Sequence, residues 1–120
     1  MTRVVRRRYL ALKIDSEEQL EPSMVSDAIW NALLRLFGEV GASQSGLYTV
    51  RSDKESNFIV LRCSHKALPM VKASLAAVTN VEGKRAVIHV LRVSGTLKAL
   101  SRKITTLQGN LALKPKNKLS

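Results

Sequence analysis

The spacing of apolar residues changes along this chain between the two-residue period of a strand and the longer period of a helix. Leu10, Leu12 and Ile14 fall on one face of an extended segment, as in a half-buried strand. After Pro22 the apolar residues form a helical stripe that continues to Phe37. The same reading over the rest of the chain predicts strand 4–14, helix 23–37, strands 46–52 and 58–64, helix 66–79 and strand 84–94.

Glycine and hydroxyl residues mark the ends of some of these elements. Gly38 suits the position just past the first helix. Gly95 interrupts the last strand, and Thr96 can cap a third helix whose apolar residues keep helical spacing to about Leu107. The predicted order is therefore β-α-β-β-α-β with one helix appended.

This order predicts an α+β fold. Two split βαβ units give a two-layer αβ sandwich, in which a four-stranded antiparallel sheet carries helices packed on one face, as in ferredoxin-like and RNA-recognition domains. We predict one such domain over residues 1–108, with a basic N-terminal arm, and a basic, mobile tail over residues 109–120.

Positive charge is concentrated at both ends of the chain. The net charge is +11, no acidic residue follows Glu82, and four arginines lie between residues 3 and 8. A folded chain of this charge repels itself, so a polyanionic partner is expected. Nucleic acid is the natural one, because each Lys or Arg that neutralises a phosphate releases condensed counterions.

The sequence has few groups that could perform catalysis or bind a metal. Cys63 is the single cysteine, and His65 and His89 have no paired carboxylate or cysteine at ligand spacing. The carboxylates cluster between residues 15 and 27, where they complement the start of a helix. We expect no catalytic residues, no metal site and no bound cofactor. No apolar run approaches the ~18 residues of a membrane span, so a cytoplasmic protein is predicted.

Several basic side chains are candidates for contacts with RNA. Lys98 and Arg102 are four residues apart on the third helix, with Lys103 beside them. The turn before this helix offers hydroxyls and backbone N–H groups that can bind a phosphate. Arginines on the strands can contact the RNA backbone. The predicted RNA-binding residues are Arg6, Arg7, Arg8, Tyr9, Arg62, Arg92, Lys98, Arg102 and Lys103, with Ser94, Gly95 and Thr96 as phosphate anchors.

Aromatic residues that could stack on bases are few. Tyr9, Tyr48 and Phe58 are the ones in predicted strands, and the segment after Phe58 lacks the glycine- and aromatic-rich pattern of the usual RNA-recognition strand. We therefore expect contacts with the backbone of a structured RNA to dominate over stacking, with Tyr9 as the candidate that stacks. On the first helix, Trp30 and Leu34 lie off the main apolar stripe and are candidates for a protein partner, although Trp30 also suits a peripheral core position.

Several short segments carry a resemblance to a known family, in order along residues 3–107. They are Arg6-Arg7-Arg8-Tyr9-Leu10, Ala28-Ile29, Phe37-Gly38, Arg62-Cys63 and, most specific, Val90-Leu91-Arg92-Val93-Ser94-Gly95-Thr96-Leu97-Lys98. Together they resemble ribonuclease P protein component 2, the Pop-five-like subunit of archaea and eukaryotes, and the short chain favours the archaeal form.

The resemblance implies an αβ sandwich and a place in ribonuclease P, the ribonucleoprotein endonuclease that removes the 5′ leader from precursor tRNA. It implies that the RNA subunit holds the Mg²⁺ ions and performs the hydrolysis. The implied partners are the ribonuclease P RNA, precursor tRNA, a β/α-barrel-like protein subunit and other ribonuclease P proteins. A homodimer within a heterotetramer is a further implied possibility.

Three other functions remain open on the sequence. A generic RNA-binding domain of another ribonucleoprotein would depend on aromatic stacking. An acylphosphatase-like hydrolase would bind phosphate in the loop after the first strand, but that loop carries Asp15, Glu17 and Glu18, which repel phosphate. A module that binds only proteins would leave the positive charge unexplained.

Overall fold

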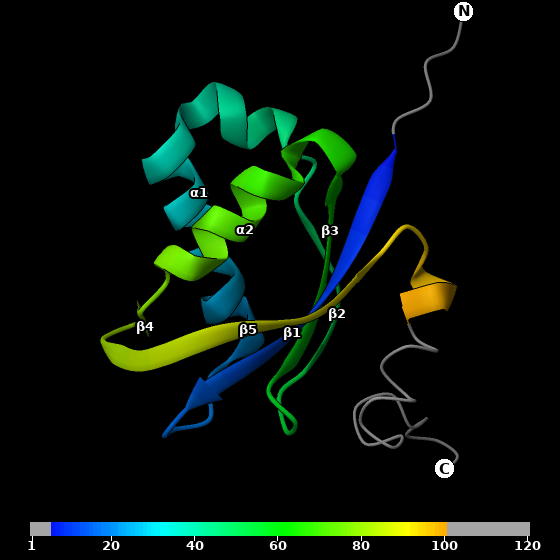
Figure 1. Ribbon diagram of the computed structural model, residues 1–120. Helices are drawn as coiled ribbons and strands as arrows, with labels where there is room; N and C mark the ends of the chain where they lie inside the picture. Colours follow the sequence, from blue (N-terminus) through cyan, green and yellow to red (C-terminus); the bar gives the residue numbers. More distant parts are fainter. Residues whose placement is uncertain (1–5, 101–120) are drawn as a thin grey trace, which may run out of the picture.

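Two helices pack on one face of an antiparallel sheet in the computed structural model, which describes residues 6–100 (Figure 1). The sheet has five strands in the order β2-β3-β1-β5-β4. In chain order, the elements are β1 Arg7–Ser16, α1 Pro22–Gln44, β2 Tyr48–Asp53, β3 Phe58–Ser64, the 3-10 turn η1 His65–Ala67, α2 Leu68–Ala77, β4 Asn80–Val81 and β5 Lys84–Ser94. The predicted α+β class, with an antiparallel sheet and helices, is confirmed.

The predicted number of four strands is wrong, because β4 adds a fifth strand at the edge. Glu82 and Gly83 have φ of 52° and 82°, and this tight turn folds the chain back on itself. Val81 then pairs with Lys84 and Asn80 with Arg85. Two residues are too short to show a strand period, so the sequence gives no sign of β4.

The sequence predicts that the first helix ends just before Gly38, but in the structure it does not. Gly38 has φ 76° and ψ 175°, which is not helical, but the chain resumes the helix and continues to Gln44. This backbone conformation is essentially restricted to glycine. Gly38 therefore bends α1 instead of ending it.

The main core lies between the sheet and the two helices. Leu10, Leu12 and Ile14 on β1 point toward α1 and α2, which contribute Ile29 and Leu75 among others. The alternation predicted for β1 is thus confirmed. All five of these residues are at most 2% exposed.

A second, smaller core covers part of the opposite face of the sheet. The third helix begins as predicted, with the Ala99 N–H donating to the Thr96 hydroxyl at 3.1 Å. Its first turn lies on the side of the sheet away from α1 and α2 (Figure 1), and Leu100 is 1% exposed against Ala11, Phe58 and Val60. The expectation that this face lacks a helix is therefore wrong. The rest of the predicted third helix lies outside the described residues.

Candidate nucleic-acid interface

One end of the sheet gathers basic residues from the start of β1, the end of β3 and the turn η1 that follows β3. Because the strands are antiparallel, β1 and β2 begin where β3 and β5 end. The His65 N–H donates to the Arg6 carbonyl at 2.8 Å, which extends the β1–β3 ladder into the N-terminal arm. We call this the basic end, and its cations are Arg6, Arg7, Arg8, Arg62 and Lys66.

The opposite end of the sheet carries most of the acidic residues, and several of them are paired. Glu21 forms an ion pair with Lys54, and Glu18 forms one with Lys84 at 3.2 Å. The His89 Nε2 lies 3.8 Å from an Asp15 carboxylate oxygen. We call this the acidic end, and its carboxylates are Asp15, Glu17, Glu18, Glu21, Asp53, Glu55 and Glu82.

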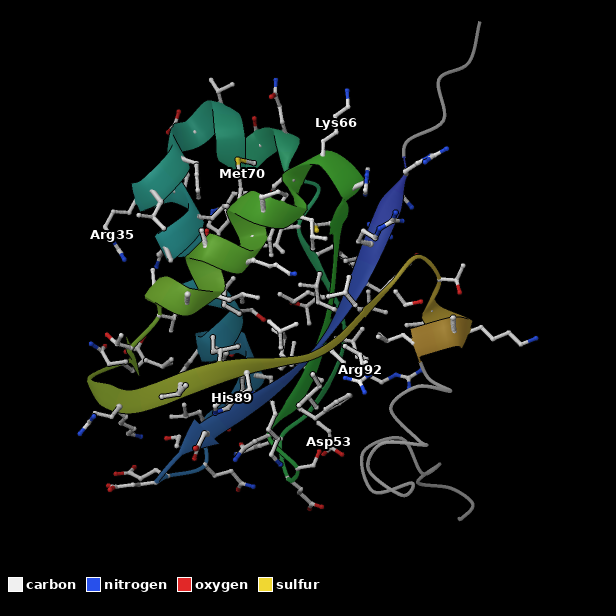
Figure 2. The ribbon with its side chains drawn as sticks, viewed as in Figure 1. Arg35, Asp53, Lys66, Met70, His89 and Arg92 are labelled. Atoms are coloured by element: carbon white, nitrogen blue, oxygen red, sulfur yellow. The ribbon has the colours of Figure 1, made fainter. Side chains whose placement is uncertain are left out.

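The two ends therefore differ in the sign of their charge and in whether their charged side chains form ion pairs. Figure 2 shows Lys66 and Asp53 at opposite ends of the sheet. Within residues 6–100, no cation of the basic end forms an ion pair, and neither does Arg92 or Lys98. Positive potential is thus concentrated at the start of β1, where the predicted RNA-binding residues Arg6, Arg7 and Arg8 lie.

A row of side chains crosses the sheet on the face away from α1 and α2. Arg62 on β3 pairs with Tyr48 on β2 and with Tyr9 on β1, and Tyr9 pairs in turn with Ser94 on β5. The Arg62 guanidinium carbon lies 4.8 Å from the centre of the Tyr48 ring. Cross-strand pairing thus brings together Tyr9, Arg62 and Ser94, which the sequence singles out separately.

Tyr48 belongs to this row, although the predicted RNA-binding residues do not include it. The residue is 57% exposed. Its stacking on Arg62 follows from the register of the β2–β3 hairpin. The sequence does mark Tyr48 as one of the few aromatic residues in a predicted strand, but only the register shows that it lies beside Arg62.

Arg92 reaches the same face through an irregularity in β5. Ala11 pairs with Arg92 but Leu12 pairs with Val90, so Leu91 is an extra residue in the strand. A bulge of this kind reverses the faces of the residues that follow. Arg92 is therefore exposed on the side of the third helix (Figure 2), and its Nη1 donates to the Leu91 carbonyl at 2.9 Å.

The turn over residues 94–96 closes the row at β5. Ser94 is 6% exposed and accepts a hydrogen bond from the Thr96 N–H at 3.4 Å. A Cβ added to Gly95 would lie 3.2 Å from Nη1 of Arg8, so that guanidinium sits against the turn. The structure thus brings Arg8 to the predicted phosphate anchors, and Lys98 is exposed on the helical turn that follows. The predicted contacts Arg102 and Lys103 lie outside the described residues.

The helix α1, which carries the two predicted protein-partner residues, also exposes other apolar side chains. Trp30 is 37% exposed and Leu34 is half-buried. Leu36, Phe37 and Val40 are also exposed, at 47%, 37% and 70%. The helical stripe predicted from the sequence includes Leu36 on the core side, so its exposure departs from that prediction, whereas Val40 lies beyond the bend at Gly38 and outside the predicted helix.

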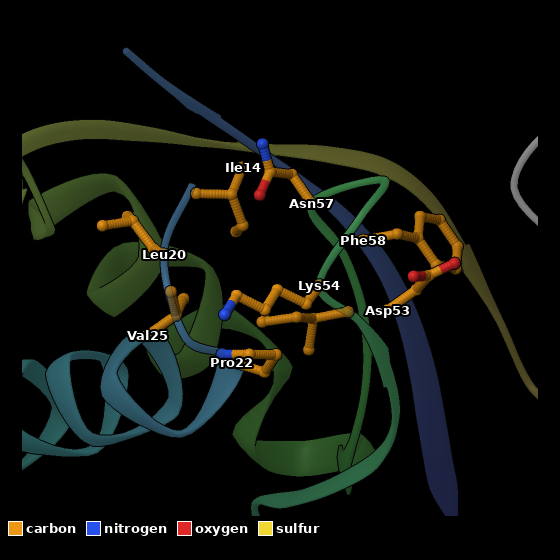
Figure 3. A pocket seen from close by; sticks show the side chains of 9 residues that line it. Ile14, Leu20, Pro22, Val25, Asp53, Lys54, Asn57 and Phe58 are labelled. Atoms are coloured by element: carbon orange, nitrogen blue, oxygen red, sulfur yellow. The ribbon is translucent and has the colours of Figure 1, made fainter. Parts of the chain in front are cut away.

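A small pocket opens at the acidic end, between β1, the start of α1 and the β2–β3 turn (Figure 3). Its volume of about 10 Å³ fits roughly one water molecule. The residues that line it are Ile14, Leu20, Pro22, Val25, Asp53, Lys54, Asn57, Phe58 and Ile59. A pocket of this size is too small for a nucleotide.

The thiol of Cys63 lies in the core of the domain. Burial raises the pKa of the Cys63 thiol to about 11, against a smaller opposing effect of the Arg8 charge. This thiol is 0% exposed and stays protonated near neutral pH.

Among the helices in the described part of the chain, none has the length and apolar character needed to cross a membrane.

Comparisons with known proteins agree with this architecture. The model of the Rpp14/Pop5 family matches residues 8–105. The chain is 36% identical to ribonuclease P protein component 2 of Pyrococcus furiosus over 104 residues, which cover 87% of each chain. It is 38% identical to the protein of that name from Archaeoglobus fulgidus, over 82% of this chain and 87% of the other.

A solved structure shares the fold at much lower sequence identity. A chain in the cryo-EM structure of yeast ribonuclease MRP superposes with a TM-score of 0.64 at 15% identity, over 92% of this chain and 96% of that one. The family match and the archaeal relatives span nearly the whole described domain. The chain therefore belongs to the Rpp14/Pop5 family.

Proposed function

We propose that this protein is a subunit of ribonuclease P, in which it supports the RNA that removes the 5′ leader from precursor tRNA. Membership of the Rpp14/Pop5 family and the archaeal relatives named ribonuclease P protein component 2 support this function. The observation that carries the mechanism is the separation of charge along the sheet. Within residues 6–100, the cations of the basic end form no ion pairs, while Glu18 and Glu21 at the other end are paired with lysines.

In this proposal the protein acts electrostatically. Folding the catalytic core of an RNA brings phosphates together, and two unit charges 4 Å apart repel by about 1 kcal/mol in water and about 4 kcal/mol near a protein surface. A rigid array of cations lowers this cost, and with it the Mg²⁺ concentration that the RNA needs. The sheet supplies the rigidity, because the ladders to β3 and β5 fix where β1 presents its arginines.

Each group of cations has its own part in the contact. Arg6, Arg7 and Arg8 contact RNA from the start of β1, while Arg62 and Arg92 contact it from the face of the sheet. Lys98, Arg102 and Lys103 contact the phosphate backbone from the third helix, and Ser94, Gly95 and Thr96 anchor a phosphate beside Arg8. Bond cleavage belongs to the RNA and its Mg²⁺ ions, and this polypeptide contributes no catalytic group.

The apolar surface on α1 is the proposed contact with protein. Trp30, Leu36, Phe37 and Val40 expose apolar area within one helix. Arg35 points away from the sheet on the same helix (Figure 2). Clustered apolar area of this kind is typical of a protein-binding surface. We propose that it binds a protein subunit of the particle, with the β/α-barrel-like subunit as the partner.

The test is reconstitution of precursor-tRNA cleavage over a series of Mg²⁺ concentrations. Addition of this chain, with the barrel-like subunit present, is expected to lower the Mg²⁺ concentration at half-maximal cleavage. A variant with Arg6, Arg7 and Arg8 changed to Ala should lower it much less. An unchanged Mg²⁺ requirement with the wild-type chain, or cleavage by the chain without RNA, would overturn the proposal.

A further inference from the structure

We propose that Tyr48 and Arg62 form a binding site for one unpaired RNA nucleotide at the basic end of the sheet. In this site the base stacks on the Tyr48 ring and the phosphate accepts hydrogen bonds from the Arg62 guanidinium. The inference rests on the proposed function, because it names the part of an RNA that this surface binds. It differs from the predicted backbone contacts in requiring an unpaired base.

In the described part of the chain, the Arg62 guanidinium has no anionic partner. It is half-buried, and its Nε is buried without a hydrogen-bond partner. Within residues 6–100 its side chain makes no ion pair or hydrogen bond, and its guanidinium carbon lies 4.8 Å from the centre of the Tyr48 ring. A half-buried charge without an anion is costly, since its lost hydration is not replaced. A bound anion would complete this site.

Tyr48 determines which kind of anion fits. Tyr48 as a residue is 57% exposed on an edge strand, which leaves room for a planar group beside it. Stacking on an aromatic ring together with hydrogen bonds from a guanidinium is how proteins bind unpaired nucleotides. A carboxylate from a protein would satisfy Arg62 but would leave the tyrosine ring exposed.

The surroundings limit the site to a single nucleotide or little more. Toward the acidic end of the same face, the first turn of the third helix covers the sheet, with Leu100 packed on Ala11 and Val60. Across the row, Tyr9 is half-buried and packs against this second core. An extended run of stacked bases therefore cannot lie across the sheet, whereas the cations of the basic end favour one nucleotide beside Tyr48.

The test compares two substitutions at one exposed position in the full-length chain. The probes are a fluorescein-labelled oligouridylate and a short RNA duplex with the same number of phosphates. Tyr48→Ala should weaken oligouridylate binding by roughly fivefold or more and leave duplex binding nearly unchanged, whereas Tyr48→Phe, which keeps the ring, should bind as the wild type does. Arg62→Lys keeps the charge but not the planar group, so it too should lose preference for the single strand.

A second measurement locates the contact directly. Oligouridylate that carries 5-iodouridine should crosslink to Tyr48 on irradiation, as mapped by mass spectrometry. Equal binding by Tyr48→Ala and Tyr48→Phe, or equal loss on duplex and single strand, would overturn the inference. A defect of Tyr48→Ala confined to association with the barrel-like subunit would also overturn it, in favour of a protein contact.

The failure of this inference can be distinguished from that of the proposed function. If wild-type chain lowers the Mg²⁺ requirement of cleavage and Tyr48→Ala binds oligouridylate normally, only the nucleotide site is wrong. If wild-type chain leaves the Mg²⁺ requirement unchanged, the proposed function fails whatever Tyr48 does.

Discussion

Burial of a single thiol gives this domain a pH dependence that can be measured. The pKa of Cys63 rises to about 11 from 9.0 because the side chain is 0% exposed. Between about pH 9 and 11 the thiol of the unfolded chain loses its proton while that of the folded chain keeps it. The unfolded state is therefore stabilised as the pH rises through this window.

We predict that the wild-type chain loses about 2 kcal/mol of unfolding free energy relative to Cys63→Ala over this window. Urea unfolding of both proteins at a series of pH values measures the difference. The cavity left by Cys63→Ala lowers stability by the same amount at every pH, so it does not affect the slope. Parallel pH profiles for the two proteins would show that the thiol is not shielded.

At the scale of single residues, the sequence is enough to place Arg62 in the candidate site but not Arg92. Alternation along β3 is enough to place Arg62 on the face of Phe58 and Val60, because the strand is regular. Arg92 differs, since regular alternation from Ile88 would point it toward the helices. The bulge at Leu91 reverses it, and no residue in the segment marks that bulge.

At the scale of elements, long periodic segments were predictable and short or interrupted ones were not. The β1 and β3 strands follow from alternation and β-branched residues. The destination of the third helix was not predictable, because helical spacing identifies an apolar stripe but not the surface that it will cover. Leu100 packs on Ala11 and Phe58, which are remote in sequence.

The first turn of the third helix should therefore stabilise the whole domain. We predict that Leu100→Ala lowers the free energy of unfolding by about 2 to 4 kcal/mol, because it removes a fully buried side chain from the second core. Ala99→Gly, two positions after the start of the turn, tests helix propensity alone and should lower it by about 1 kcal/mol. Thermal and urea unfolding measure both. Equal effects would mean that this turn adds helix but no core.

The bend in α1 gives a second prediction for an element. Gly38 has a φ of 76° with ψ of 175°, and an added Cβ would meet nothing within 4 Å. The cost of Gly38→Ala is therefore backbone strain alone, about 1 to 3 kcal/mol. Asn31→Ala, on the exposed side of the same helix, is the control and should change stability little. If Gly38→Ala stabilised the chain, as alanine does in a regular helix, the bend would not be part of the native state.

At the scale of the whole molecule, the antiparallel topology brings charges that are dispersed in the sequence to two ends of the sheet, one basic and one acidic. Arg6 is far from Arg62 and Lys66 in the chain, but all three lie where β1 begins and β3 ends. The acidic loop after β1 is paired with Lys54 and Lys84 at the other end. The net charge predicts a polyanionic partner, and the strand order is the basis for our proposal of which surface binds it.

Two variants of equal net charge test this polarity. The first changes Arg6, Arg7 and Arg8 to Ala, and the second changes Lys54, Lys84 and Arg85 to Ala. Each removes three positive charges, and all six positions are exposed or half-exposed, so neither variant should unfold.

Affinity for the ribonuclease P RNA is measured as a function of salt concentration. The logarithm of affinity falls linearly with the logarithm of salt, with a slope set by the number of phosphates contacted. Loss of the three arginines should reduce that slope by about 2 to 3, because each phosphate contact contributes about 0.9. Loss of the other three cations should leave the slope almost unchanged, since they lie at the acidic end, away from the proposed RNA contacts. If both variants reduced the slope equally, RNA affinity would depend on the net charge alone, and the separation of charge along the sheet would have no role in binding.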